Sequence, residues 1–254
     1  MNLIEIYRTR FRSGIVAEFL PPVKPSSKKV AILAPGMPWY PGTKRELLMR
    51  LSKKGYFSFI IRYRGTWESD GSFLELSPHE DIISIINELP LGFQDLWSTA
   101  EYKITDPEVY LLGGSFGGPA AILASTDPRV KKAVAISPVT DWREQEHTVE
   151  PLEFMNDYMQ KAFGPAFRST PLAYKKLARG DFYNPTHEEK TIDGKKLLLI
   201  HARDDRVVHF EPAEKFAKAV GATFVPLSSG GHMGVGSADE PSIWKHIEKF
   251  FNAK

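Results

Sequence analysis

Short apolar runs separated by helix-like stretches are the feature of this sequence that most restricts its fold. Most of the runs are continuous in valine, isoleucine, leucine and alanine, as is typical of parallel strands buried on both faces. These runs cover Val30–Ala34, Phe57–Arg62, Val109–Gly113, Ala133–Ser137, Leu197–Ala202 and Thr223–Leu227. Candidate helices between and after them cover Lys44–Lys54, Pro78–Leu89, Pro119–Ser125, Pro212–Val220 and Ser242–Phe251. This alternation predicts a doubly wound α/β sheet.

Two further runs precede this alternation. Leu3–Arg8 and Ile15–Leu20 flank a Ser13-Gly14 turn, which predicts an antiparallel hairpin. With these two runs the sheet is expected to have eight strands and to be mostly parallel. The 254 residues fit one such domain, so residues 1–254 are expected to form a single unit.

The segment 140–194 interrupts the alternation and is too long for a plain connection. It is rich in aromatic residues and methionine, and Phe154 and Tyr158 repeat at helical spacing. We therefore expect a small helical insertion or lid over the sheet. Its aromatic side chains either pack as core or line a substrate pocket, for which Trp142, Phe154, Tyr158 and Trp39 are the candidates.

Composition excludes several classes of function. There is no cysteine, so disulfides and thiolate chemistry are excluded, and there is no apolar run long enough to cross a membrane. The first residues do not resemble a signal peptide, which favours the cytoplasm. Residues 1–64 hold 13 Lys/Arg against 3 Asp/Glu, but no basic tract is interleaved with aromatic residues as in nucleic-acid binders. We expect neither nucleic acid nor membrane as a partner; the oligomeric state stays open.

A G-x-S-x-G pentapeptide, Gly113-Gly114-Ser115-Phe116-Gly117, lies between a predicted strand and a predicted helix. In that context the pattern is typical of a nucleophile elbow, whose sharp turn needs small residues beside the serine. The alternative is a phosphate-binding turn, but the Gly-Lys-Ser/Thr ending is missing. The sequence therefore predicts Ser115 as a nucleophile.

A serine nucleophile needs a base that an acid holds in one tautomer. Among seven histidines, only His232 lies in a glycine-rich loop after the last predicted strand, where such a base is expected. The loop after Leu197–Ala202 offers two adjacent acids, Asp204 and Asp205. The residues alone leave these two open.

At this loop the chain resembles the prolyl-oligopeptidase-like branch of the α/β-hydrolases, whose acid loop reads H-G-x-x-D-x-x-V. Residues 201–208 match that register with Ala202 in place of glycine, and the resemblance implies Asp205 as the acid. Residues 64–71 look like the R-G-x-x-x-S-x-G loop of the same family. The resemblance spans nearly the whole chain and implies the α/β-hydrolase fold.

An oxyanion hole needs two backbone N–H groups aimed at the developing negative charge. One is expected from Phe116, which follows the nucleophile. The other is expected from the loop after Val30–Ala34, where Pro35-Gly36 replaces the family's H-G. Pro38 has no N–H, so Met37 is the expected donor.

The resemblance implies a serine hydrolase that works without a cofactor. The chain has no room for a β-propeller, which favours hydrolysis of carboxylic esters of small to medium acyl chains through an acyl-enzyme. The first alternative is an aminopeptidase or dipeptidyl peptidase, with an acidic grip on the substrate's amino group from Glu144, Glu146, Glu150 or Glu153. The second is a catalytically silent ligand-binding homologue. No H-E-x-x-H or similar His pair predicts a metal.

Overall fold

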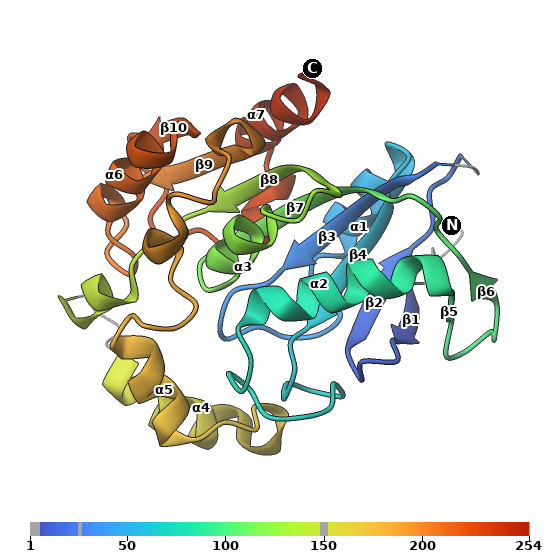
Figure 1. Ribbon diagram of the computed structural model, residues 1–254, viewed down its shortest axis with the longest axis horizontal. Coiled ribbons are helices and arrows are strands. Elements are labelled where there is room, and N and C mark those ends of the chain that lie inside the picture. Colours follow the sequence, from blue (N-terminus) through green and yellow to red (C-terminus); the bar gives the residue numbers. More distant parts are fainter. Residues whose placement is uncertain (1–5, 25–26, 148–151, 254) are drawn as a thin grey trace.

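An eight-stranded sheet forms the centre of the protein in the computed structural model, which describes residues 6–24, 27–147 and 152–253 (Figure 1). The strand order is β1-β2-β4-β3-β7-β8-β9-β10. The strands are β1 (Tyr7–Arg10), β2 (Val16–Leu20), β3 (Lys29–Ala34), β4 (Phe57–Arg62), β7 (Glu108–Gly114), β8 (Val130–Ile136), β9 (Leu197–Ala202) and β10 (Thr223–Leu227). This is the α/β-hydrolase fold, and the predicted fold class is confirmed.

The antiparallel part of the sheet is confined to its N-terminal edge. Strand β2 runs antiparallel to both β1 and β4, and the pairs from β4 to β10 are parallel. The predicted hairpin is present, but β1 begins later than the expected Leu3–Arg8. At its other end β1 continues to Arg10, because the chain turns between Phe11 and Ile15, where the Phe11 N–H donates to the Ile15 C=O at 2.8 Å. Leu3, Ile4 and Glu5 lie outside the described residues.

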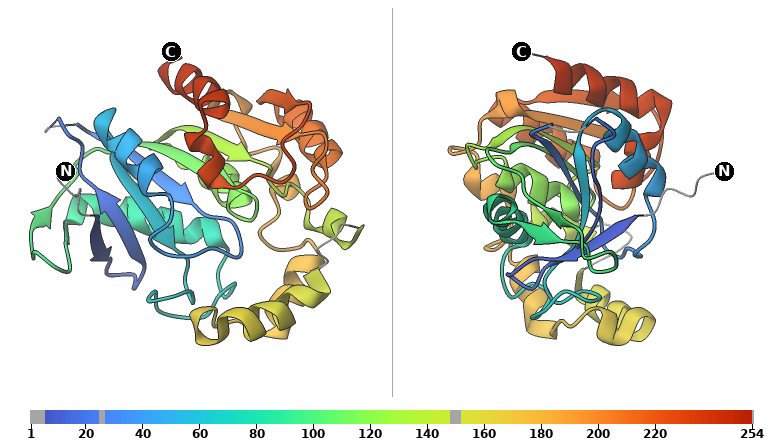
Figure 2. Two further views of the ribbon diagram at one scale, coloured as in Figure 1. Left: turned by 180° about the vertical axis from the view of Figure 1, so that it is seen from behind. Right: turned by 90° about the vertical axis from the view of Figure 1, so that its right-hand side faces the viewer.

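Helices cover both faces of the sheet. Helices α2 (Pro78–Glu88) and α3 (Gly117–Ala124) lie side by side on one face, and α1 (Arg45–Lys53) and α7 (Pro241–Asn252) lie on the other (Figures 1 and 2). Helix α6 (Phe210–Val220) connects β9 to β10. Covered on both faces, the side chains of β3 from Val30 onward and of β7 from Val109 onward are buried. A small hairpin was not predicted from the sequence. Its strands, β5 (Phe93–Gln94) and β6 (Glu101–Tyr102), have two residues each.

The insertion contains two helices, α4 (Leu152–Phe163) and α5 (Pro171–Ala178), which lie beyond the carboxyl ends of the strands (Figure 1). It is tied to the loop after β4 by backbone hydrogen bonds. The N–H of Trp67 donates to Ala166 at 2.7 Å, and Arg168 exchanges bonds with Gly65 and Phe73 at 2.8 and 2.7 Å. The expected helical character of the insertion is therefore seen, and this end of it is anchored to the sheet domain.

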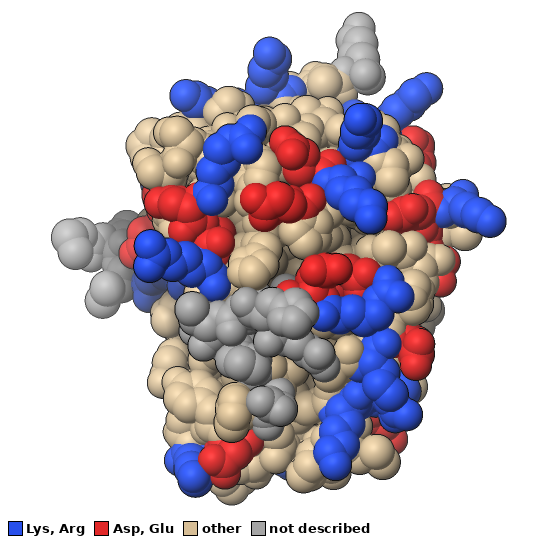
Figure 3. All heavy atoms as spheres, turned by 90° about the vertical axis from the view of Figure 1, so that its left-hand side faces the viewer, with Lys and Arg blue, Asp and Glu red and all other residues tan. Residues whose placement is uncertain are grey.

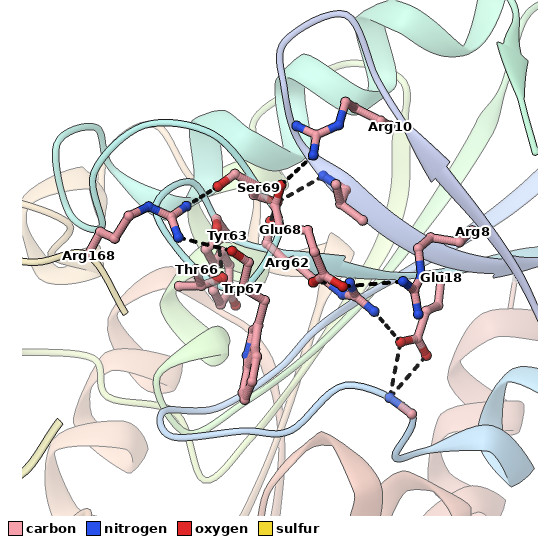
Figure 4. A network of polar contacts seen from close by, with 12 residues as sticks. Arg8, Arg10, Glu18, Arg62, Tyr63, Thr66, Trp67, Glu68, Ser69 and Arg168 are labelled. Carbon is pink, nitrogen blue, oxygen red and sulfur yellow. Dashed lines mark hydrogen bonds and ion pairs between the residues drawn. The ribbon is translucent and has the colours of Figure 1, made fainter. Parts of the chain in front are cut away.

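Buried and partly buried arginines reinforce that anchor (Figure 4). Arg62 is fully buried at the end of β4, donates to Glu18 at 2.6 Å and also pairs with Glu68. From the insertion, the guanidinium of Arg168 donates to the carbonyls of Trp67, at 3.0 Å, and of Ser69. A buried arginine needs such partners because an unpaired buried charge costs several kcal/mol, about 3–5 when one partner of a pair is removed.

The basic residues of the N-terminal quarter are largely paired with acids from later in the chain. Ion pairs join Arg8 to Glu68, Arg10 to Asp70, Arg50 to Asp239 and Arg64 to Asp81. On the face drawn in Figure 3, basic and acidic side chains are interspersed. The charge asymmetry of the sequence is thus offset in space by pairing. In the described parts of the chain, no helix is both long and apolar enough to span a membrane.

Candidate active site

Ser115 occupies a sharp turn between β7 and α3. Its φ of +52° lies in the left-handed region, which costs a residue other than glycine about 1–3 kcal/mol and persists where the surroundings enforce it. The turn is enforced by close packing, since a Cβ on Gly113 would come within 2.1 Å of the Gly117 carbonyl oxygen. A Cβ on Gly117 would come equally close to the Ala34 carbonyl oxygen. The flanking glycines therefore permit the turn that presents Ser115.

Ser115, His232 and Asp205 form a continuous hydrogen-bonded chain. The Nε2 atom of His232 lies 2.8 Å from the Ser115 Oγ, and its Nδ1 lies 2.9 Å from Oδ2 of Asp205. A carboxylate only accepts hydrogen bonds, so Nδ1 carries the proton and Nε2 is free to accept the serine proton. Ser115 lies in the turn after β7, Asp205 in the loop after β9 and His232 in the loop after β10.

The carboxyl of Asp205 is buried and receives several donors. Its Oδ1 accepts the backbone N–H groups of Val207 and Val208, each at 3.0 Å. Burial alone would raise the pKa of Asp205, but hydrogen bonds from His201, His232 and the Val208 N–H outweigh it and hold that pKa well below its usual range. Asp205 is therefore an anion at neutral pH.

Asp204, the competing acid, holds the loop that carries the histidine. Its Oδ1 accepts the backbone N–H of Gly231 at 2.8 Å. On the other side of His232, the N–H of Met233 donates to the Oγ of Ser137 at 3.3 Å. The imidazole is thus positioned from both flanks, and Ser137 is a supporting residue that sequence reasoning missed.

The loop after β3 passes directly over the serine. A Cβ on Gly36 would lie 3.3 Å from the Cβ of Ser115, so the Gly36–Met37 peptide is adjacent to the hydroxyl. The next peptide, Met37–Pro38, is cis. The backbone N–H groups of Met37 and Phe116, the two expected oxyanion donors, have no hydrogen-bond partner among the described residues. Both are therefore free to bind a substrate oxygen.

Two buried tyrosines hold these two backbone segments, and sequence reasoning missed both. The hydroxyl of Tyr63, after β4, donates to the carbonyl of Pro35 at 2.9 Å. The hydroxyl of Tyr183, from the insertion, donates to the carbonyl of Phe116 at 2.5 Å. Burial raises the pKa of each hydroxyl well above 10, so both remain donors. No motif in the sequence signals either role.

The aromatic candidates for a substrate pocket have different environments. Trp142 is 2% exposed, stacks on Tyr183 and donates its indole N–H to the Tyr183 carbonyl at 2.6 Å, so it supports the elbow from within the core. Trp39 is 6% exposed, whereas Phe154 and Tyr158 are 64% and 51% exposed on α4. A lining role for any of the four stays a prediction.

The acidic grip considered for a peptidase is only partly described. The side chain of Glu144 is exposed, and Glu150 lies outside the described residues. Of the side chains of Glu146 and Glu153 nothing is described. Among the described residues, no group of three or more His, Asp or Glu side chains is arranged to hold a metal ion.

Most of the chain matches the sequence model of a known protein family. The sequence model of the Prolyl oligopeptidase family matches residues 45–252. A search of curated proteins found no match.

Solved structures share the fold at low sequence identity. An esterase of Pyrococcus furiosus superposes with a TM-score of 0.67 at 16% identity, over 97% of this chain and 90% of that one. The α/β-hydrolase GrgF from Penicillium sp. has the same TM-score and identity, over 97% and 96%. Acylaminoacyl peptidase of Pyrococcus horikoshii has a TM-score of 0.61 at 17% identity, over 97% of this chain. This chain spans 40% of that peptidase.

Proposed function

Because the chain belongs to the Prolyl oligopeptidase family of serine hydrolases, we propose that it hydrolyses carboxylic esters of small to medium acyl chains through an acyl-enzyme at Ser115. The observation that carries this proposal is the hydrogen-bonded chain from Ser115 through His232 to Asp205. A catalytically silent binding homologue would not need a histidine base hydrogen-bonded to a serine in a strained backbone conformation.

The mechanism follows from the geometry. His232 Nε2 takes the serine proton while Oγ bonds to the ester carbonyl carbon, and the carbonyl π electrons move to oxygen. The N–H groups of Phe116 and Met37 stabilise that oxyanion. On collapse, the bond to the alkoxy group breaks and the His232 proton goes to the leaving alcohol. Water then repeats the same steps, releasing the acid and Ser115.

The preference for esters over peptides is supported by the insertion and by the esterase of Pyrococcus furiosus, which shares the fold over 90% of its own chain. The roof of the site is the compact insertion, tied to the loop after β4 through Arg168. We propose that this roof limits the acyl chain, with Trp39, Trp142, Phe154 and Tyr158 as candidate lining residues.

The test is kcat/KM across p-nitrophenyl esters from acetate to palmitate, below any critical micelle concentration. Each methylene buried in an apolar pocket is worth about 0.8 kcal/mol, so kcat/KM should rise about fourfold per methylene until the pocket is full. We expect kcat/KM to reach its maximum between butyrate and hexanoate. A steady rise through dodecanoate would contradict the small-ester proposal and favour a lipase.

A parallel assay with aminoacyl p-nitroanilides addresses the peptidase alternative. The proposed esterase should turn these anilides over far more slowly than p-nitrophenyl butyrate. A higher kcat/KM for an anilide with a free amino group than for its N-acetylated form would indicate a grip on the amine. That result would replace the esterase proposal with an aminopeptidase.

A further inference from the structure

The acid of the proposed triad contacts a second histidine. His201 is the fifth residue of β9 and is completely buried. Its Nε2 lies 3.0 Å from the Val208 carbonyl oxygen and 3.2 Å from Oδ2 of Asp205. Oδ2 is also the atom that accepts the Nδ1 proton of His232. One carboxylate oxygen therefore faces two imidazoles.

The surroundings of His201 fix which nitrogen carries its proton. The Val208 carbonyl can only accept a hydrogen bond, so Nε2 must be the protonated nitrogen. The Nδ1 atom is buried and has no hydrogen-bond partner among the described residues. A second proton there would be a buried donor without an acceptor, which is unfavourable. The Nε2 proton of His201 thus bonds to the Val208 carbonyl, and the same nitrogen lies 3.2 Å from Oδ2 of Asp205.

We propose that His201 is a positioning residue that sets the basicity of His232 by acting through Asp205. The inference rests on the function proposed above. A donor on Oδ2 withdraws negative charge from the atom that faces His232. It thereby weakens the stabilisation that Asp205 gives to protonated His232. His232 therefore loses its proton at a lower pH than it would without this donor. The ring of His201 also packs edge-on against that of Phe210, with 5.8 Å between the ring centroids, which fixes the direction of the His201 Nε2 atom.

Charged groups near this pair in the described structure include Arg203, whose guanidinium lies over the Phe210 ring, 4.4 Å from its centroid. Asp204 and Asp205 come from the loop after β9, and Asp204 bonds to Gly231 beside His232. His201 comes from β9, and Lys44 lies over Gly236, four residues beyond His232. Among the hydrogen bonds and ion pairs of the described residues, neither Asp204 nor Lys44 is a partner of Asp205 Oδ2. Substitution of His201 therefore removes a donor from this oxygen and from the Val208 carbonyl and leaves both other groups in place.

The decisive variant is His201→Phe, which keeps a ring and removes the donor. We expect the midpoint of the acid limb of the kcat/KM profile with p-nitrophenyl butyrate to move up by about half a pH unit, because the unshielded carboxylate stabilises protonated His232 more strongly. His201→Gln, whose amide nitrogen can replace Nε2, should return the midpoint toward that of the wild type. His209→Phe, at the start of α6, is the matched control and should not move it.

A merely structural role predicts a different pattern. A loosened Asp205 would lose contact with His232, so the midpoint in His201→Phe would fall and Gln would not restore it. Either an unchanged or a lowered midpoint in a folded His201→Phe overturns the inference. If the wild type neither hydrolyses esters nor reacts with a fluorophosphonate, the proposed function has failed instead.

A measurement on the wild type keeps the inference testable if His201→Phe does not fold. Nitrogen-15 NMR of labelled histidines distinguishes protonated from unprotonated ring nitrogens. We expect His201 to be protonated at Nε2 and unprotonated at Nδ1 throughout the titration of His232. A His201 protonated at Nδ1 in its neutral form would exclude the bond to Asp205 and overturn the inference.

Discussion

The hydroxyl of Tyr183 donates to the carbonyl of Phe116 at 2.5 Å, which joins the insertion to the residue after the proposed nucleophile. The same insertion residue receives the indole N–H of Trp142 on its own carbonyl. Two residues of the insertion, Tyr183 and Trp142, therefore help to hold the elbow in place. The insertion thus contributes to the geometry of the site.

Tyr183→Phe should lower kcat about fivefold to tenfold and leave KM nearly unchanged, because the elbow loses a support that positions the Phe116 N–H. Loss of one buried hydrogen bond should also lower the free energy of unfolding by about 1 kcal/mol. The measurements are steady-state kinetics and urea denaturation. Tyr102→Phe, on β6, is the control. Equal kinetics for the two variants would show that the Tyr183 contact does not serve the site.

Substitution of the adjacent residues Asp204 and Asp205 should have very different effects on kcat. Asp205→Asn should lower kcat about 10⁴-fold, because an amide would hold His232 in the wrong tautomer. Asp204→Asn should have a far smaller effect, since an amide oxygen can still accept the N–H of Gly231. Kinetic constants of the two purified variants decide the assignment. The reverse ranking would make Asp204 the acid.

Asp81 makes stability depend on pH. Burial raises its pKa from 3.8 to about 6, although the Arg64 backbone N–H donates to it at 2.8 Å. The folded state therefore binds a proton that the unfolded state releases between pH 4 and 6, so this residue's contribution to stability falls as pH rises through that window. A pKa raised from 3.8 to about 6 corresponds to about 3 kcal/mol.

Asp81→Asn cannot titrate, so its stability relative to the wild type should increase by up to about 3 kcal/mol between pH 4 and pH 7. Urea denaturation at several pH values measures this difference. The exposed Asp106→Asn is the control and should show no such trend. A difference between Asp81→Asn and the wild type that does not change with pH would contradict a raised pKa in the folded state.

Much of the fold could be predicted because its strands are buried on both faces. Runs such as Phe57–Arg62 and Leu197–Ala202 are mostly apolar, and the structure reproduces both bounds. Strand β5 contains only Phe93 and Gln94, too few for any periodicity. Helix α3 begins at Gly117 and not at the expected Pro119, because the elbow leads directly into the helix.

The supporting residues of the site could not be predicted in the same way. Ser115, Asp205 and His232 lie in motifs, whereas Tyr183 and Tyr63 act through hydroxyl contacts with distant backbone. Sequence cannot separate an aromatic core residue from one that lines a pocket, so a lining role for the buried Trp142 stays a prediction. His201 did have a signal, since it opens the H-G-x-x-D-x-x-V pattern that identified Asp205.

The most direct test of the account is covalent labelling of Ser115. A fluorophosphonate should modify the wild type at Ser115 alone, as located by peptide mass spectrometry, and should abolish ester hydrolysis in proportion to labelling. Ser115→Ala should remain folded, resist labelling and lose about 10⁶-fold in kcat, while Ser84→Ala on α2 should behave as the wild type. Labelling at another residue, or more than a few per cent of activity in homogeneous Ser115→Ala, would contradict the assignment of Ser115 as the nucleophile.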